Sequence, residues 1–257
     1  MRICAGVLLG ILPGVIGVIQ EAPRPAPDVL VGVSYAPPPG ATLAGPDGAV
    51  RGELEGIRRA GFNLVVVASR AGTIDRFVEA AVEADLHVLS TAHQPAPLRR
   101  IVVGTEANGL QEARLAFWDA VAAGARVMYF SSGERLTRRQ ILALGETAGI
   151  VTRNQPVFAA LAPRAHGVRG IEGPGGAAID VRLLESAELM VIIALNRAAE
   201  RRDAVISFER DIPEAIWQNL ETGTSTSFVM GGGGPVLEHT FAARDALVLM
   251  IRKRFRD

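Results

Sequence analysis

The chain has 257 residues, 49% of them hydrophobic, which is enough for one large core or two modest ones. Its 27 Lys and Arg residues balance 27 Asp and Glu residues. Without a basic excess, nucleic acid is excluded as a partner. The single cysteine, Cys4, excludes an internal disulfide bond. Four scattered histidines predict no metal site, and we expect no cofactor.

The first residues have the layout of an export signal. Met1–Arg2 gives a short positive start, residues 3–19 are almost wholly apolar, and a Pro-rich stretch occupies residues 23–27. This layout predicts a secretory signal peptide and linker over residues 1–26, and therefore a secreted or periplasmic protein. The alternative is an uncleaved membrane anchor, for which an apolar run interrupted by Pro13 is short.

Residues 27–166 alternate apolar runs with amphipathic stretches. Strands that are apolar along their whole length and joined through helices are typical of a parallel sheet covered on both faces. The expected strands span residues 29–35, 62–67, 86–90, 101–104 and 126–130, and the expected helices span 54–60, 74–84, 110–123 and 138–148.

This α/β region is too short for a complete barrel. An eight-stranded (β/α) barrel takes about 250 residues and rarely fewer than about 200. Five strands therefore indicate either an incomplete TIM-barrel-like domain or a small doubly wound sheet.

Residues 167–257 read as all-β, and we expect a β-sandwich domain there. Residues 178–184 alternate apolar and polar side chains, and Gly231–Gly234 predicts a turn. Further strands are expected over residues 189–195, 204–208, 215–217, 227–230 and 246–251.

Several short motifs, taken together, resemble one enzyme family. They are Val31–Tyr35 with Pro37, Arg59–Asn63, Leu89–Pro97, Val103–Gly109, Ala123–Phe130, Trp217–Gly223 and Arg244–Leu249. In this order they resemble β-galactosidase-like glycoside hydrolases of the large retaining (β/α)8-barrel clan, in which a β-domain follows the barrel. The resemblance implies a retaining β-glycosidase that acts on a carbohydrate substrate.

The chain also departs from that family. Retaining glycosidases need two carboxyl groups about 5–5.5 Å apart, one a nucleophile and the other a general acid/base. In the family the acid/base follows an Asn, but no Asn-Glu pair occurs in this sequence. Barrel strands four to six are missing between Pro97 and Ile101. Whether the chain is an enzyme therefore stays open: hydrolysis is impaired by loss of the acid/base, or the chain is a non-catalytic remnant that binds carbohydrate or protein.

Two glutamates are the candidate catalytic residues. The resemblance makes Glu106, which follows an apolar strand, the nucleophile; the alternative is a carboxylate stabilised by the start of the next helix. Glu134, after the fifth strand, is the candidate acid/base, although a solvated helix-start residue is the simpler interpretation.

Four further residues are candidates for substrate binding. Tyr35 and Tyr129 end strands and would line a sugar site, unless they are core residues. His93 lies in a Pro-rich loop. Asn108 would orient the substrate or cap the helix that follows it. An incomplete barrel also leaves open strand edges, so a homo-oligomer is expected.

Overall fold

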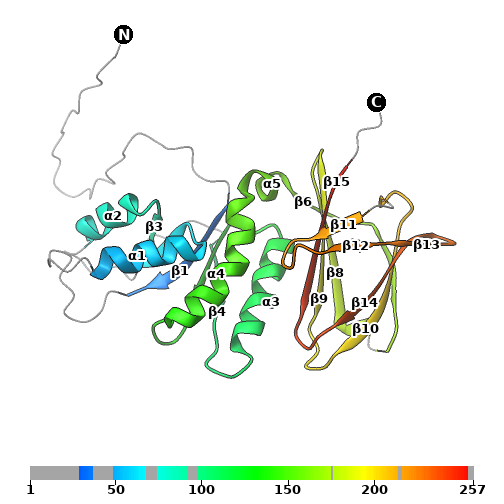
Figure 1. Cartoon of the computed structure of the whole chain (residues 1–257), viewed down its shortest axis with the longest axis horizontal. Coiled ribbons are helices and arrows are strands. Elements are labelled where there is room, and N and C mark those ends of the chain that lie inside the picture. The colour runs from blue at the N-terminus through cyan, green and yellow to red at the C-terminus, as the bar shows by residue number, and fades with distance from the viewer. Residues whose placement is uncertain are drawn as a thin grey trace, which may run out of the picture.

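The computed structural model describes residues 29–36, 49–67, 74–91, 98–174, 176–213 and 216–253. A parallel sheet with its helices comes first in the chain, and two antiparallel sheets follow it (Figure 1). The expected signal segment and His93 lie outside the described residues. Among the described residues, none of the helices has the length and apolar character needed to cross a membrane.

The parallel sheet has five strands in the order β3-β2-β1-β5-β4. β4 starts earlier than the sequence predicts, because Leu98 already pairs with Val127 and the polar pair Arg99–Arg100 lies within the strand. The strands are β1 (Leu30–Tyr35), β2 (Leu64–Val67), β3 (His87–Ser90), β4 (Leu98–Val102) and β5 (Val127–Ser131).

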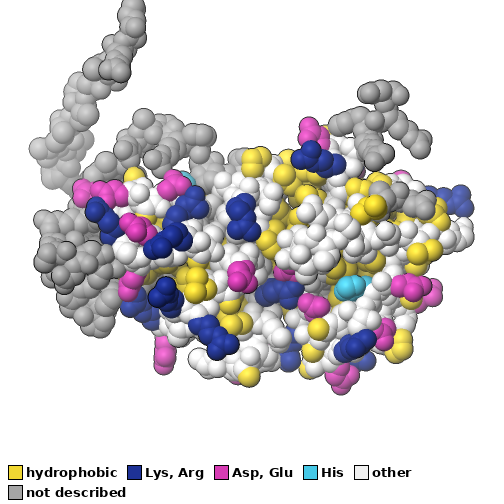
Figure 2. Space-filling model, viewed as in Figure 1, with side chains coloured by type: hydrophobic (Ala, Val, Ile, Leu, Met, Phe, Trp, Pro, Cys, Tyr) yellow, Lys and Arg dark blue, Asp and Glu magenta, His cyan; other side chains and the backbone are white. Residues whose placement is uncertain are grey.

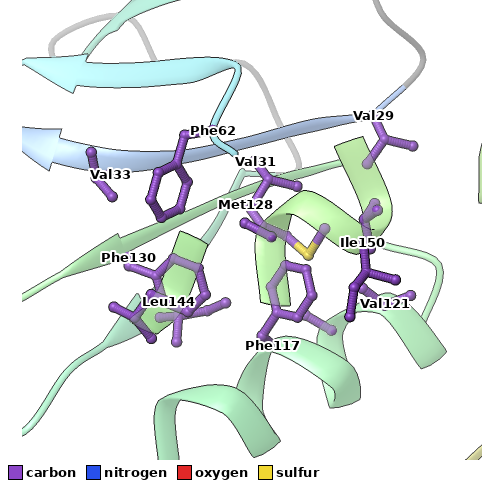
Figure 3. Close-up of a cluster of buried hydrophobic side chains, with 14 of the residues drawn as sticks. Val29, Val31, Val33, Phe62, Phe117, Val121, Met128, Phe130, Leu144 and Ile150 are labelled. Carbon is purple, nitrogen blue, oxygen red and sulfur yellow. The ribbon is translucent and has the colours of Figure 1, made fainter. Parts of the chain in front are cut away.

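Four long helices cover one face of this sheet. A single hydrophobic core joins Leu54, Phe77, Phe117 and Leu144, one from each helix, to alternate strand residues. Figure 3 shows Phe117 and Leu144 beside Val31 of β1. Among the described residues, the opposite face carries a small cluster that includes Tyr129. The helices are α1 (Ala49–Ala60), α2 (Ile74–Glu83), α3 (Gly109–Ala122) and α4 (Arg138–Arg153), followed by the short α5 (Gln155–Ala160).

Strand order and helix placement together identify part of a barrel. In a (β/α) barrel consecutive strands are neighbours and all helices lie outside the ring. Removing three consecutive strands from an eight-stranded ring leaves the order seen here, with β3 and β4 at the two ends. A doubly wound sheet would carry helices on both faces. The prediction of a partial TIM-barrel-like region is confirmed at this level.

The segment between α1 and β2 fixes how β1 begins. Gly61 ends α1 with a φ of +114°, and α4 lies so close that no side chain would fit there. The buried amide of Asn63 accepts a hydrogen bond from the Val31 N–H at 2.8 Å and donates one to the Val29 carbonyl at 3.1 Å. The motif Arg59–Asn63 therefore serves the architecture of the sheet.

The C-terminal region is a sandwich of two antiparallel sheets, in the orders β13-β14-β10-β7 and β12-β11-β15-β9-β8-β6. It begins at β6, a few residues before the expected boundary at Gly167. The strands are β6 (Ala162–Arg164), β7 (Val168–Glu172), β8 (Ile179–Glu185), β9 (Leu189–Asn196), β10 (Arg202–Phe208), β11 (Ile216–Asn219), β12 (Ser225–Ser227), β13 (Val229–Gly231), β14 (Gly234–Phe241) and β15 (Ala246–Arg252).

The six-stranded sheet is covered on both faces. Its inner face joins a core between the two sheets that contains Ile192 and Trp217, and its outer face packs on α3 through Val191 and Ile193. β9 is buried along its entire length for this reason. The two regions therefore share a continuous hydrophobic core at α3.

A cluster of polar side chains closes the same contact, and we call it the α3–sandwich cluster: Arg114, Trp118, Glu221 and Asp245. The Arg114 guanidinium forms a bidentate ion pair with Glu221 and a 3.1 Å ion pair with Asp245. The indole N–H of the fully buried Trp118 donates to Glu221 at 2.9 Å. Glu221 and Asp245 both belong to the C-terminal motifs that resemble the glycosidase β-domain.

Candidate functional site

The carboxyl edge of the parallel sheet is where barrel enzymes carry their catalytic residues. Glu106 lies in the loop after β4, and Glu134 lies in the loop after β5. Because β4 and β5 are adjacent parallel strands, both loops leave the same edge of the sheet. Both side chains are exposed.

Glu106 sits in a tight loop between Gly104 and Gly109. The Gly109 N–H donates to the Glu106 carbonyl at 2.9 Å, and the Glu106 side chain folds back over Gly104. A side chain at either glycine would collide with the loop itself. Within the described part of the chain, the Glu106 carboxylate has neither a hydrogen-bond donor nor an ion-pair partner.

Glu134 is equally unconstrained. The Ser132 hydroxyl donates to its backbone carbonyl, but no described residue binds its carboxylate. Acid/base carboxyl groups are usually held in apolar surroundings, which favour the protonated form at neutral pH. The exposed Glu134 lacks such surroundings.

Asn108 lies at the start of α3. It occupies the N-cap position of that helix, but its side chain caps no backbone N–H. It donates instead to Glu112 of the same helix at 2.8 Å, and Glu112 pairs with Arg244 of the sandwich at 3.0 Å. The link between the start of α3 and the sandwich is therefore made by Glu112.

A third carboxylate at this edge, Glu53 of α1, was not anticipated from the sequence. The Tyr35 hydroxyl donates to Glu53 Oε2 at 2.6 Å, and Arg135 forms an ion pair with the same oxygen at 2.5 Å. Arg135 also lies over the Tyr35 ring, 5.7 Å from its centre, and Phe77 stacks on that ring. Nothing in the local sequence pattern marks Glu53, because its place at this edge depends on contacts with Tyr35 and Arg135.

This environment keeps Tyr35 protonated. Burial is the largest cause that raises the pKa of Tyr35 well above its usual value, and the hydrogen bond to the negatively charged Glu53 raises it further. Arg135 acts in the opposite direction. Tyr35 is therefore a hydrogen-bond donor at neutral pH and not a base.

The two candidate tyrosines lie on opposite faces of the sheet. Tyr35 belongs to the core under the helices, whereas Tyr129 packs against Leu64 and Val66 on the opposite face of the sheet. The same opposite face carries Arg100, which pairs with Tyr129 in register and whose Nε donates to the Ser131 hydroxyl at 2.8 Å. The structure therefore does not bring Tyr35 and Tyr129 together around one ligand. Among the described residues, no group of three or more metal-binding side chains occurs.

A cleft of about 710 Å³ opens beside Tyr35, between α1 and the beginning of α4. Its walls are the end of β1, one side of α1 and the segment from Arg135 to Leu142. Because Tyr35 faces the helices, this cleft lies on the helix-covered side of the sheet. It was not anticipated from the sequence.

Neither a family model nor a curated protein sequence matches the chain. Solved structures do match. A maltogenic alpha-amylase from Thermotoga neapolitana superposes with a TM-score of 0.52 at 9% identity, over 88% of this chain and 99% of that one. An alpha-amylase from Geobacillus thermoleovorans gives 0.43 at 11% identity, over 81% and 48%. A GH30 endoxylanase from Clostridium papyrosolvens gives 0.36 at 7% identity, over 75% and 49%.

These likenesses concern the fold. At 9% identity, the superposition with the maltogenic amylase shows that this chain has a glycoside-hydrolase-like fold. The chain spans about half the length of the endoxylanase that it matches. Substrate and reaction must therefore be argued from the residues of this chain.

Proposed function

We propose that this protein is a glycoside-hydrolase-like carbohydrate-binding protein, of the retaining β-glycosidase type, whose hydrolysis is impaired by loss of the acid/base. The observation that supports this proposal is the strand order β3-β2-β1-β5-β4, which is the order left when three consecutive strands are taken out of an eight-stranded ring. In the family that the sequence resembles, the acid/base belongs to that missing part. The carbohydrate would bind at the carboxyl edge, near Glu106.

The exposure of Glu106 and Glu134, the two candidate catalytic residues, supports carbohydrate binding without hydrolysis. A retaining mechanism needs a nucleophile and an acid/base held about 5–5.5 Å apart. Within the described residues, the carboxylates of Glu106 and Glu134 have no partners that would hold them at any fixed separation. A carbohydrate can still accept and donate hydrogen bonds at this edge.

The second candidate function is an active retaining β-glycosidase with Glu106 as the nucleophile. The position of Glu106 directly after β4, beside the loop that carries Glu134, favours it. β-Galactosidase-like specificity belongs to this candidate.

The choice of leaving group separates the two candidates. Dinitrophenyl β-glycosides have leaving groups that depart without protonation, whereas unactivated oligosaccharides need a general acid. We expect oligosaccharides to bind in isothermal titration calorimetry and to remain intact. Turnover of oligosaccharides that Glu106→Gln abolishes would establish the active enzyme. A burst with dinitrophenyl glycosides alone, lost in Glu106→Gln and retained in Glu134→Gln, would identify a nucleophile without its acid/base. Absence of both binding and turnover would overturn the carbohydrate function.

We also propose that the protein is exported to the periplasm or beyond, on the basis of residues 1–26 alone. Cell fractionation of the full chain tests this proposal. Retention in the cytoplasm would contradict it.

A further inference from the structure

The cleft between α1 and α4 has a largely apolar lining. Ile57, Leu136 and Ile141 line it, together with Leu142, which is 50% exposed. A ligand pocket is typically 300–1,000 Å³ with mostly apolar walls, and the volume of about 710 Å³ falls within this range.

The α1 wall is open because it is built from glycines. Gly52 and Gly56 lie one turn apart and line the cleft, and no atom comes within 4 Å of the position that a Cβ would take at either residue. A larger side chain at Gly56 would occupy this space, and a helical position tolerates such a change.

The charges around the cleft are predominantly positive. Arg59, Arg135 and Arg138 line it, and Glu53 is the only acidic residue among its described lining residues. The Glu53 carboxylate already accepts a hydrogen bond from Tyr35 and forms an ion pair with Arg135. Figure 2 shows dark blue Lys and Arg side chains gathered beside yellow apolar ones on the half of this face that carries the helices.

Two of these arginines have no carboxylate partner among the described residues, so their charges are free to pair with a ligand. Within the described part of the chain, the Arg59 side chain donates through Nε to the Glu55 backbone carbonyl, at 3.3 Å, and to no carboxylate. Arg138 has no carboxylate partner among the described residues. Arg138 is also the first residue of the 16-residue helix α4, whose N-terminus adds positive potential at the same place.

From this arrangement we propose that the α1–α4 cleft binds a small organic anion. Its apolar body lies against Ile57 and Ile141, and its carboxylate or phosphate pairs with Arg59 and Arg138. Guanidinium groups bind both kinds of anion through charge-assisted hydrogen bonds. The site goes beyond the proposed function, because the cleft lies on the helix-covered side of the sheet and uses neither Glu106 nor Glu134.

Calorimetry with three probes of equal chain length tests the site: dodecanoate, dodecyl phosphate and dodecan-1-ol, each below its aggregation concentration. We expect at least one of the two anions to bind at a single site, and the uncharged alcohol to bind about tenfold more weakly or not at all. The tighter anion identifies the headgroup. Binding should weaken as salt rises.

Four variants localise the binding. Arg59→Gln and Arg138→Gln should each weaken it about tenfold, and Gly56→Leu should abolish it by filling the cleft. Arg139→Gln is the matched control, because Arg139 is the exposed neighbour of Arg138 and does not line the cleft. Thermal unfolding of each variant verifies that it is folded.

Three results would overturn the proposal: no binding of either anion, equal binding of dodecan-1-ol, or unchanged anion binding in folded Gly56→Leu. Oligosaccharide binding is measured separately in the same variants. Loss of anion binding with oligosaccharide binding intact, or the reverse, shows which of the two proposals has failed.

Discussion

Carboxylates have opposite surroundings at two places in the molecule. One place is the contact between α3 and the sandwich, and the other is the carboxyl edge of the parallel sheet. At the contact, Glu221 is 12% exposed and receives hydrogen bonds from both Arg114 and Trp118. At the carboxyl edge, Glu106 and Glu134 are exposed, and no described residue binds their carboxylates. All three belong to segments that the sequence analysis singled out for their likeness to a glycosidase or for catalysis.

The motifs that join the two regions therefore differ from the segments that were expected to carry catalytic residues. Motifs that hold the two regions together are fully satisfied by internal hydrogen bonds and ion pairs, as buried charges must be. The candidate catalytic residues Glu106 and Glu134 have no side-chain partners among the described residues, whereas the candidate binding residue Tyr35 does. A working catalytic constellation needs such support to hold its geometry. Among the described residues such support is therefore present for Glu221 and absent for Glu106 and Glu134.

The largest expected effect is at Trp118. It is fully buried, with its ring edge-on to Phe117 and its N–H bonded to Glu221. Trp118→Ala should lower the free energy of unfolding by about 3–5 kcal/mol, because it opens a cavity between α3 and the sandwich. Denaturant unfolding measures this loss. In Trp118→Phe most of the packing remains, so a loss as large as that of the alanine variant would contradict the packing explanation.

The same substitution at two carboxylates tests the comparison directly. Glu221→Gln removes the charge that faces Arg114, and we expect it to destabilise the protein by about 1–3 kcal/mol. Glu106→Gln changes an exposed side chain, and we expect a change within about 0.5 kcal/mol. Both values come from denaturant unfolding under identical conditions. Equal losses would remove the distinction between the two regions.

A smaller effect on stability is expected at His239, and it depends on pH. Burial, the larger cause, lowers the pKa of His239 below its usual 6.5, while the nearby Asp245 raises it. The unfolded chain therefore binds more protons at this residue than the folded one. Its contribution to stability is present above pH 6.5 and is lost as the pH falls through the folded pKa. His239→Gln should reduce the loss of stability between pH 7.5 and pH 5.5, as measured by urea unfolding. An unchanged pH dependence would contradict this assignment.

Much of the fold could be predicted because its signals are local. β1, β2 and β5 are largely apolar runs, and the helix expected over residues 110–123 ends at Ala122, just before Gly124 with its φ of +80°. The strands that were missed had weaker patterns. The exposed Arg99 and Arg100 hide the start of β4, and polar residues interrupt β7 and β14.

The arrangement of side chains around the sites could not be predicted, because it depends on contacts between distant segments. Glu53 meets Tyr35 across 18 positions, and Arg114 meets Glu221 across 107. Gly52 and Gly56 line the cleft between α1 and α4 and leave open space where a side chain would lie. Helix periodicity identifies which side of α1 is buried, but it does not show that a second helix leaves space beside it.

The smallest effect on stability is expected at an edge strand of the parallel sheet, where it tests the expected homo-oligomer. β3 and β4 end the described sheet, and strand edges of this kind pair readily with another chain. Val102 on β4 is 62% exposed, so Val102→Lys should change stability by no more than about 0.5 kcal/mol. A charge on an edge strand opposes pairing, so self-association measured by light scattering should nevertheless weaken. Leu142→Lys is the control, because Leu142 is 50% exposed but lies on α4. If the folded wild-type chain is strictly monomeric at every concentration, the parallel sheet is stable with its edges unpaired, and the expectation of self-association fails.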